Sequence, residues 1–227
     1  MNKIFLISGK ARSGKDTVFN LFEDILGRDR VKRWAFADYL KEICSDYFYW
    51  NGVKDDKGRN LLIKVGQFLR GEFEVDTKNS QFIFDTNKFE FDNLLYCNEK
   101  VHPLCTENTY FSYLDVFYKL MGEFQPNVNF WAEHLYKEIF TSQKSYEWNL
   151  ITDYRFPSEY DCLIENIQNK EVIVKTIRVE RKSSLKLEDR SETALDDFKF
   201  DYKIFNNGTI EDLKRKVLSI IDSNKEK

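Results

Sequence analysis

A short apolar run followed by a glycine loop is the feature that most constrains this chain. The run from Ile4 to Ile7 has the length of a buried strand, and Gly9 and Gly14 then frame a loop that ends on Lys15. Glycines at these two positions let the backbone curl with its N–H groups pointing inward, and the lysine can reach the outer phosphates of a nucleotide. Apolar residues at helical spacing follow from Thr17 to Leu26. The sequence therefore predicts a strand, a phosphate-binding loop and a helix whose N-terminus faces the same anion.

The residue after this lysine departs from the usual pattern. The motif G-x-x-x-x-G-K-[ST] expects a hydroxyl for Mg²⁺ directly after the lysine, whereas this chain has Asp16 there and the hydroxyl one residue later, at Thr17. We expect these two residues to lie nearest the metal ion. The alternative is a glycine-rich surface turn without a ligand.

Length and composition limit the class of protein. A chain of 227 residues can form one large α/β domain with an elaboration, or two small domains. Its net charge of −3 gives no general attraction to nucleic acid, so we expect no nucleic-acid partner. The cysteines are scattered without a C-x-x-C pair and no secretory leader is evident, which predicts a cytoplasmic protein with free thiols. No apolar stretch approaches the ~20 residues of a membrane span, which predicts no membrane contact. Whether it is a monomer or a homodimer is left open.

Two helices are expected in the first third of the chain, after a second strand at Val31–Ala37. One begins near Asp38, which is either the N-cap or a ligand-facing residue at the end of a parallel strand. The other covers Arg59–Arg70, whose terminal arginines are either solvated charges or anion-binding groups.

The segment 72–127 differs in character and is predicted to be an inserted α+β segment. Residues 82–84 and 89–91 suggest the arms of a hairpin, and 110–121 suggest a helix. Cys97, His102 and Cys105 have a spacing loosely like a metal knuckle, but no fourth ligand is evident, and a loop with two ordinary thiols is the competing interpretation.

A second informative stretch runs from Asn149 to Glu159. A short buried strand brings Asp153 and Arg155 to its carboxyl end, and Glu159 lies in the first turn of the helix that follows. In a phosphate-loop protein such an aspartate suggests an acid linked to Mg²⁺, and the arginine could hold a phosphate. The alternative is an Asp–Arg ion pair that closes a loop.

The C-terminal third predicts two more strands, at Val172–Val179 and Phe200–Phe205, and a last helix capped by Thr209. Between the strands lies a charged segment that runs to about Arg190. It is predicted to be a lid that brings arginines over the phosphates, or else a solvated loop.

In their order, these motifs resemble those of the deoxynucleoside monophosphate kinases of bacteriophages and, more distantly, the animal phosphomevalonate kinases, which share a P-loop kinase core. The stretches that carry the resemblance are Ser8–Thr17, Phe36–Glu42, Arg59–Arg70, Phe130–Trp131, Ile151–Glu159, Ser191–Glu192 and Phe205–Thr209. The resemblance implies an α/β three-layer P-loop NTPase fold with a mostly parallel five-stranded sheet flanked by helices. The core would comprise residues 1–71 and 128–227, with a lid at about 181–199, and 72–127 would be an insertion on the acceptor side.

The resemblance also implies an activity, transfer of the γ-phosphoryl group of ATP to a deoxynucleoside monophosphate with Mg²⁺ as cofactor. The ATP site would comprise Gly9, Lys10, Ala11, Arg12, Ser13, Gly14, Lys15, Asp16, Thr17, Asn206 and Gly208. The monophosphate site would comprise Asp38, Lys41, Arg59, Gly66, Arg70, Trp131, Asp153, Arg155 and Glu159. The catalytic residues would be Lys15, Asp153, Arg155 and Arg190, the lid would supply Arg181, Lys182 and Arg190, and Asp16 and Thr17 would lie at the metal ion.

One departure from the family pattern leaves the acceptor motif open. Gln67 stands where a threonine often follows the family's glycine, and Leu120–Glu123 offers a rival alignment to the stretch between Arg59 and Arg70. A phosphomevalonate-type kinase and a nucleotide-binding regulator that transfers phosphate to no acceptor remain the alternative functions.

Overall fold

The structure is a computed structural model that describes residues 2–48, 50–71, 74–76, 81–83, 120, 122–167, 171–182 and 193–225. Cys97, His102, Cys105 and Arg190, the predicted arm at 89–91 and nearly all of the predicted helix at 110–121 lie outside these residues. The elements are β1 (Asn2–Ser8), α1 (Lys15–Leu26), β2 (Val31–Trp34), α2 (Phe36–Phe48), α3 (Asp56–Leu69), β3 (Glu74–Asp76), β4 (Gln81–Ile83), α5 (Phe130–Thr141), β5 (Trp148–Ile151), α6 (Pro157–Asn166), β6 (Val172–Glu180), β7 (Tyr202–Phe205) and α8 (Ile210–Asn224).

A five-stranded sheet with the order β2-β5-β1-β6-β7 forms the centre of the first compact unit, residues 1–36 and 132–227. Every neighbouring pair in this sheet is parallel. The register places Ser8, the last residue of β1, opposite Arg178 of β6. Because all strands run the same way, their carboxyl ends share one edge, where ligands bind in open α/β sheets. The predicted α/β class with a five-stranded parallel sheet is confirmed.

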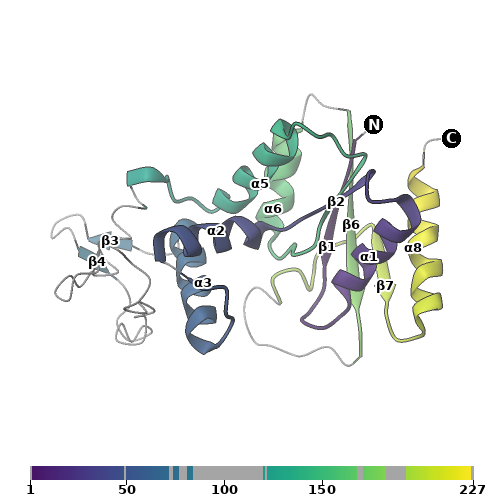
Figure 1. Cartoon of the computed structure of the whole chain (residues 1–227), viewed down its shortest axis with the longest axis horizontal. Coiled ribbons are helices and arrows are strands. Elements are labelled where there is room, and N and C mark those ends of the chain that lie inside the picture. The colour runs from purple at the N-terminus through teal and green to yellow at the C-terminus, as the bar shows by residue number, and fades with distance from the viewer. Residues whose placement is uncertain are drawn as a thin grey trace. The chain divides into compact units, whose positions relative to one another are not determined.

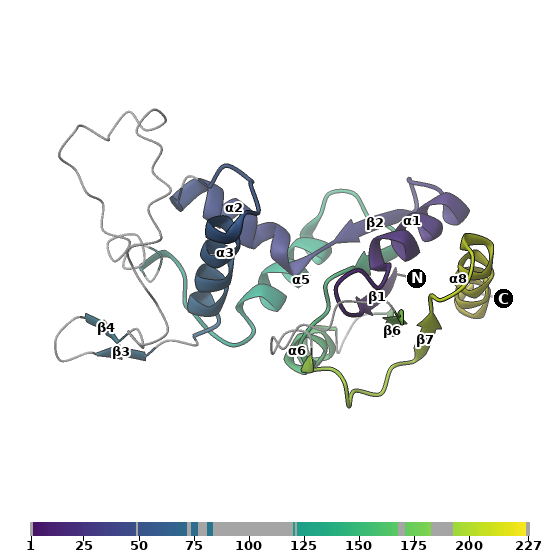
Figure 2. The same cartoon turned by 90° about the horizontal axis from the view of Figure 1, so that it is seen from below.

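Helices lie on both faces of this sheet (Figures 1 and 2). On one face α1 and α8 pack over a core in which the Phe5 and Trp148 rings stack with centroids 5.3 Å apart, and Phe22 of α1 lies 5.7 Å from Phe5. On the other face lie α5 and α6, where the Tyr136 hydroxyl donates to the Glu159 carbonyl at 2.7 Å. Burial on both faces explains why the central strands are almost continuously apolar.

Aromatic side chains pack together in the second compact unit, residues 37–131. Tyr39 of α2 contacts Phe124, Phe130 and Trp131, with ring centroids 6.2 to 6.4 Å apart. The unit takes in most of α2 and all of α3 besides the predicted insertion. Within that insertion, β3 pairs with β4 in antiparallel fashion. The described strand that pairs with the predicted hairpin arm at 82–84 therefore precedes this arm in the chain.

Several element ends differ from the predicted ones for local reasons. The helix expected from Asp38 begins at Phe36, whose N–H donates to Asp153 Oδ1 at 2.9 Å, so Asp153 provides the cap and Asp38 lies in the first turn. The helix expected from Arg59 begins earlier, at Asp56, because the carboxylate of Asp55 accepts from the N–H of Gly58 at 2.8 Å and caps α3. The predicted cap at Thr209 is confirmed.

Cysteine and membrane predictions are tested only within the described residues. Cys44 and Cys162 are buried free thiols, and burial raises the pKa of Cys44 to about 12 and that of Cys162 to about 11. Across the described ranges, the longest and most apolar helices fall short of what a membrane crossing needs.

Asp201 joins β6 to the start of β7 and gives a stability prediction. Its Oδ2 accepts from the N–H and the hydroxyl of Thr176, both at 2.8 Å, and its Oδ1 accepts from Lys175 Nζ at 3.0 Å. Burial alone would raise the pKa of Asp201, but these hydrogen bonds outweigh it and lower the pKa below its usual value. Asp201→Asn should therefore lower the free energy of unfolding by ~1–2 kcal/mol near neutral pH, as measured by urea unfolding.

The pH dependence and a control make this prediction specific. Because the folded-state pKa is lowered, the charge stabilises the fold at pH values above the pKa of the unfolded state. This stabilisation is lost as the pH falls through the folded-state pKa, so the difference between variant and wild type should shrink in acid. Asp222→Asn removes an exposed carboxylate paired with Lys225 on α8 and should change stability by less than about 0.5 kcal/mol. Equal effects of the two substitutions would contradict the prediction.

Candidate functional site

The loop between β1 and α1 curls tightly, as the glycine pattern predicts. Gly14 has a φ of 103°, and Arg12 lies in the left-handed region with a φ of 64°. The N–H of Ser13 donates back to the carbonyl of Lys10 at 3.1 Å and closes the turn. The loop can follow this path only with glycine at positions 9 and 14, because neighbouring atoms leave no space there for a Cβ.

The glycines are wedged against β6 and the residue that follows β7. A Cβ on Gly9 would lie 2.4 Å from the carbonyl oxygen of Val179, and a Cβ on Gly14 would lie 2.3 Å from Asn206 Nδ2. That same amide donates to the carbonyl of Ser13 at 2.9 Å. Asn206 therefore holds the second half of the loop, which gives this predicted ATP-site residue a structural role that its position in the sequence does not reveal.

Lys15 folds back over the loop that it follows. Its Nζ donates to the carbonyls of Gly9 at 2.6 Å and Lys10 at 3.2 Å. No side chain caps the N-terminus of α1, so this helix end presents backbone N–H groups and a positive dipole end to the loop. The arrangement suits an anion at the centre of the loop.

The two predicted metal-binding residues lie in the first turn of α1. Asp16 is exposed, and within the described part of the chain no hydrogen bond or ion pair engages its carboxylate. Thr17 is half-buried beside it. Among the described residues no group of three or more His, Cys, Asp and Glu side chains could hold a metal ion.

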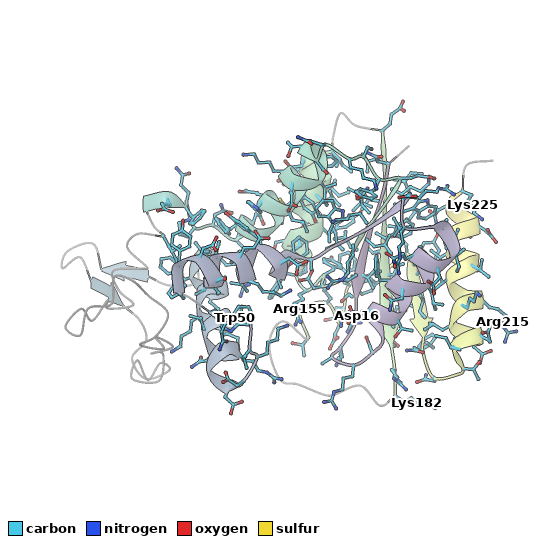
Figure 3. All side chains as sticks on the ribbon, in the orientation of Figure 1. Asp16, Trp50, Arg155, Lys182, Arg215 and Lys225 are labelled. Carbon is cyan, nitrogen blue, oxygen red and sulfur yellow. The ribbon has the colours of Figure 1, made fainter. Side chains whose placement is uncertain are left out.

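The segment after β5 lies at the same edge of the sheet as the loop. The N–H of Tyr154 donates to the carbonyl of Ile7 at 3.2 Å. Figure 3 shows Arg155 beyond the end of β5, Asp16 at the start of α1 and Lys182 beyond the end of β6. The sheet thus gathers residues that the sequence separates widely.

The three predicted substrate residues of this segment differ in their contacts. Asp153 is half-buried, with Oδ1 on the N–H of Phe36. Glu159 Oε2 accepts from the N–H groups of Arg155 at 2.8 Å and Phe156 at 3.1 Å, and so caps α6. This cap accounts for Glu159 without a substrate, because it satisfies backbone groups that would otherwise be unpaired.

A cavity of about 550 Å³ opens beside the loop. Lysine and arginine side chains outnumber carboxylates in its wall, and three phenylalanines supply apolar surface. Its described lining comprises Lys10, Arg178, Val179, Glu180, Arg181, Lys182, Leu195, Asp196, Phe198, Phe200, Lys203, Phe205 and Asn207. A volume of this size and mixed lining suit a nucleotide-sized anion with an aromatic ring. The predicted lid residues Arg181 and Lys182 belong to this wall, whereas Arg190 lies outside the described residues.

The turn after β7 is fixed by hydrogen bonds to the cavity wall. Asn207 Oδ1 accepts from the N–H of Lys182 at 2.8 Å, and the N–H of Asn206 donates to the carbonyl of Glu180 at 2.7 Å. Gly208 is needed for a different reason, since a Cβ there would lie 2.6 Å from Asp212 Oδ2. This predicted ATP-site glycine makes room for the cap of α8.

Several residues of the cavity wall were not predicted as site residues, among them Arg178, Asp196, Phe198 and Phe200. The local signal was that the strand Val172–Val179 carries two charged residues, Lys175 and Arg178, among mostly apolar ones. Asp196 meets Arg178 across 18 residues of sequence, and no periodicity indicates such a contact.

The remaining predicted substrate residues lie in the second unit. Trp131 Nε1 donates to the carbonyl of Gly66 at 3.1 Å, and a Cβ on Gly66 would lie 3.8 Å from Arg70 Nη1. Lys41 forms an ion pair with Asp38 one turn away on α2. These contacts make two local groups, one on α3 and α5 and the other on α2.

Arg59 and Arg70 lie at opposite ends of α3. Eleven residues of helix separate their Cα atoms by about 16 Å, and Arg59 Nε donates to the carbonyl of Lys54 at 3.0 Å, before the start of α3. The rival stretch Leu120–Glu123 is described only in part.

Comparison with known proteins gives no assignment. The chain matches no protein-family model, and no curated protein is similar enough to it to count as a match.

Gly14 and Gly27 provide a matched test of the wedge. Both have positive φ, 103° and 91°, but a Cβ on Gly27 would meet nothing within 4 Å. Gly27→Ala should cost only the backbone strain, about 1–3 kcal/mol, because Gly27 with a ψ of 144° lies outside the left-handed helical region. Gly14→Ala should cost at least about 1 kcal/mol more, because overpacking against Asn206 adds to the strain.

A double variant separates the two contributions. In an Asn206→Ala background the cost of Gly14→Ala, measured by urea unfolding, should fall toward that of Gly27→Ala. If the Asn206→Ala background leaves the cost of Gly14→Ala unchanged, the wedge does not exist.

Proposed function

We propose that this protein is a deoxynucleoside monophosphate kinase with a P-loop NTPase fold. The observation that carries the proposal is the wedged glycine loop, with Lys15 at the uncapped start of α1 and a cation-rich cavity beside it. The parallel sheet supports it, because the loop, the β5 segment and the cavity share one edge. The order of motifs that resembles the phage kinases supports the choice of acceptor.

In this proposal the donor nucleotide binds along the loop. The ATP phosphates would accept hydrogen bonds from the backbone between Gly9 and Thr17, and Lys15 would exchange its loop carbonyls for phosphate oxygens. The adenine would enter the cavity beside Asn207 and the phenylalanines. Arg181 and Lys182 would close over the phosphates as part of the lid.

The chemistry is an in-line phosphoryl transfer. An oxygen of the acceptor's 5′-phosphate forms a bond to the γ-phosphorus while the bond to the β–γ bridging oxygen breaks, giving a deoxynucleoside diphosphate and ADP. Because the attacking oxygen is already anionic, little base catalysis is needed, and catalysis consists of alignment and neutralisation of charge. Lys15 would stabilise the transferring group, and Arg155, with Arg190 of the lid, would bridge donor and acceptor phosphates.

The cofactor in this proposal is Mg²⁺, which would supply charge neutralisation at the phosphates. Asp16, Thr17 and Asp153 would hold it and its waters. The exposed carboxylate of Asp16 fits this role because no described protein group engages it. Asp153 Oδ1 accepts from the N–H of Phe36, which holds this carboxylate at the end of β5.

Substitution of Lys15 tests the proposed catalytic site. Lys15→Ala should lower kcat by on the order of 10³-fold or more, because it removes a positive charge from the transferring group. Steady-state ADP release measures this effect, and circular dichroism checks the fold. Lys225→Ala removes an exposed lysine at the end of α8 (Figure 3) and should leave kcat unchanged. A folded Lys15→Ala variant with wild-type turnover would rule out the proposed mechanism.

The acceptor is tested by ADP release from Mg·ATP with each deoxynucleoside monophosphate and with phosphomevalonate. We expect release to depend on at least one deoxynucleoside monophosphate and not on phosphomevalonate. Release that depends on phosphomevalonate alone would replace the acceptor in this proposal. Slow ATP hydrolysis unaffected by any acceptor would instead indicate a nucleotide-binding regulator.

A further inference from the structure

Arg178 is a charged residue of β6 whose side chain lies next to Ser8, the last residue before the glycine loop. Arg178 is only 7% exposed to solvent. Nη1 donates to Ser8 Oγ at 3.0 Å, and Nη2 donates to Asp196 Oδ1 at 2.7 Å. Its guanidinium carbon also lies 5.7 Å from the centre of the Phe200 ring. The guanidinium therefore has specific partners on three sides.

Burying a guanidinium in this position costs desolvation free energy that an apolar side chain would not. Its neighbours on β6, Ile177 and Val179, are almost fully buried, and an apolar side chain would serve packing at least as well. Burying the charge is tolerated only because the carboxylate and hydroxyl satisfy it. The energetic comparison suggests that Arg178 has a role other than stabilising the core.

Asp196 extends the contact from the sheet to the loop. Its Oδ2 lies 3.6 Å from Lys10 Nζ, so one carboxylate bridges Arg178 and Lys10. Ser8 and Lys10 flank Gly9, and the bridge thus fixes both sides of the glycine that has no space for a Cβ. Asn206 holds the other half of the loop at Ser13.

The segment that carries Asp196 is itself anchored by aromatic rings. The Phe198 ring lies 5.7 Å from that of Tyr154, and the Phe200 ring lies 6.3 Å from it. Tyr154 is the residue between Asp153 and Arg155. Asp196 is therefore fixed both to the strand ends and to the start of the loop.

We propose that Arg178 and Asp196 are a positioning pair that holds Ser8 and Lys10 in the geometry that binds a triphosphate. This inference rests on the proposed function and adds two residues to it. The pair acts on the loop through Ser8 and Lys10. Losing it should weaken binding of ATP, while the acceptor's KM is unaffected.

Three variants test the pair: Arg178→Met, Asp196→Asn and the double variant. We expect each to raise the Kd for Mg·ATP, measured by calorimetry, by on the order of tenfold, with the KM for the acceptor within about twofold of wild type. The double variant should bind no more weakly than the weaker single variant, because both substitutions break the same link. Asp196→Asn also keeps the test valid if Arg178→Met fails to fold, because Asp196 is partly exposed.

The sign of the Asp196 effect distinguishes positioning from simple electrostatics. Removing a negative charge near a polyphosphate should tighten binding if only Coulomb repulsion matters, whereas the positioning pair predicts weaker binding. Tighter or unchanged binding by Asp196→Asn would overturn the proposal.

Lys175→Met is the matched control for Arg178→Met. Lys175 lies on the same strand, and its replacement breaks the ion pair with Asp201. This variant should leave the Kd for ATP unchanged. If wild type binds ATP and Arg178→Met binds it equally well, the positioning pair is wrong and the kinase proposal stands. If wild type binds no ATP, both proposals fall.

Discussion

The close approach of the loop backbone to β6 and to the turn after β7 is the constraint on which the site depends. Parallel pairing brings the end of β1 level with β6 at Ser8 and Arg178, so the chain must turn against the carbonyl of Val179 with only a glycine to occupy the space. Once that turn is made, the start of α1 and Lys15 have defined positions. The core of Phe5, Phe22 and Trp148 then fixes α1 against the sheet.

Several carboxylates of the first unit accept hydrogen bonds from backbone N–H groups. Asp153 accepts from Phe36, Glu159 from Arg155 and Phe156, and Asp201 from Thr176. A charged acceptor on a backbone donor gives a stronger hydrogen bond than a neutral one. Such bonds can fix the loops at the ends of short strands, where no ladder of the sheet continues. Asp196 instead binds the side chains of Arg178 and Lys10, and Asp16 has no described partner.

Local patterns in the sequence predicted the elements well and the contacts between them poorly. The strands at β1, β5 and β6 and the cap at Thr209 follow from apolar runs and capping residues, because those signals act over a few neighbouring residues. Asp153 as the cap of α2 could not be predicted, since its donor Phe36 lies 117 residues away. Arg178 and Asp196 were missed for the same reason. The roles assigned to the ATP and acceptor residues remain predictions.

The folded-back position of Lys15 has a consequence for the cost of ligand binding. Its ammonium already lies on two carbonyl oxygens, so a phosphate that takes their place need not strip a fully hydrated cation of its water shell. The side chain is also partly immobilised beforehand, which lowers the entropy lost when a ligand arrives. The free loop is in this sense preorganised: the lysine changes partners, and the backbone around it keeps its shape.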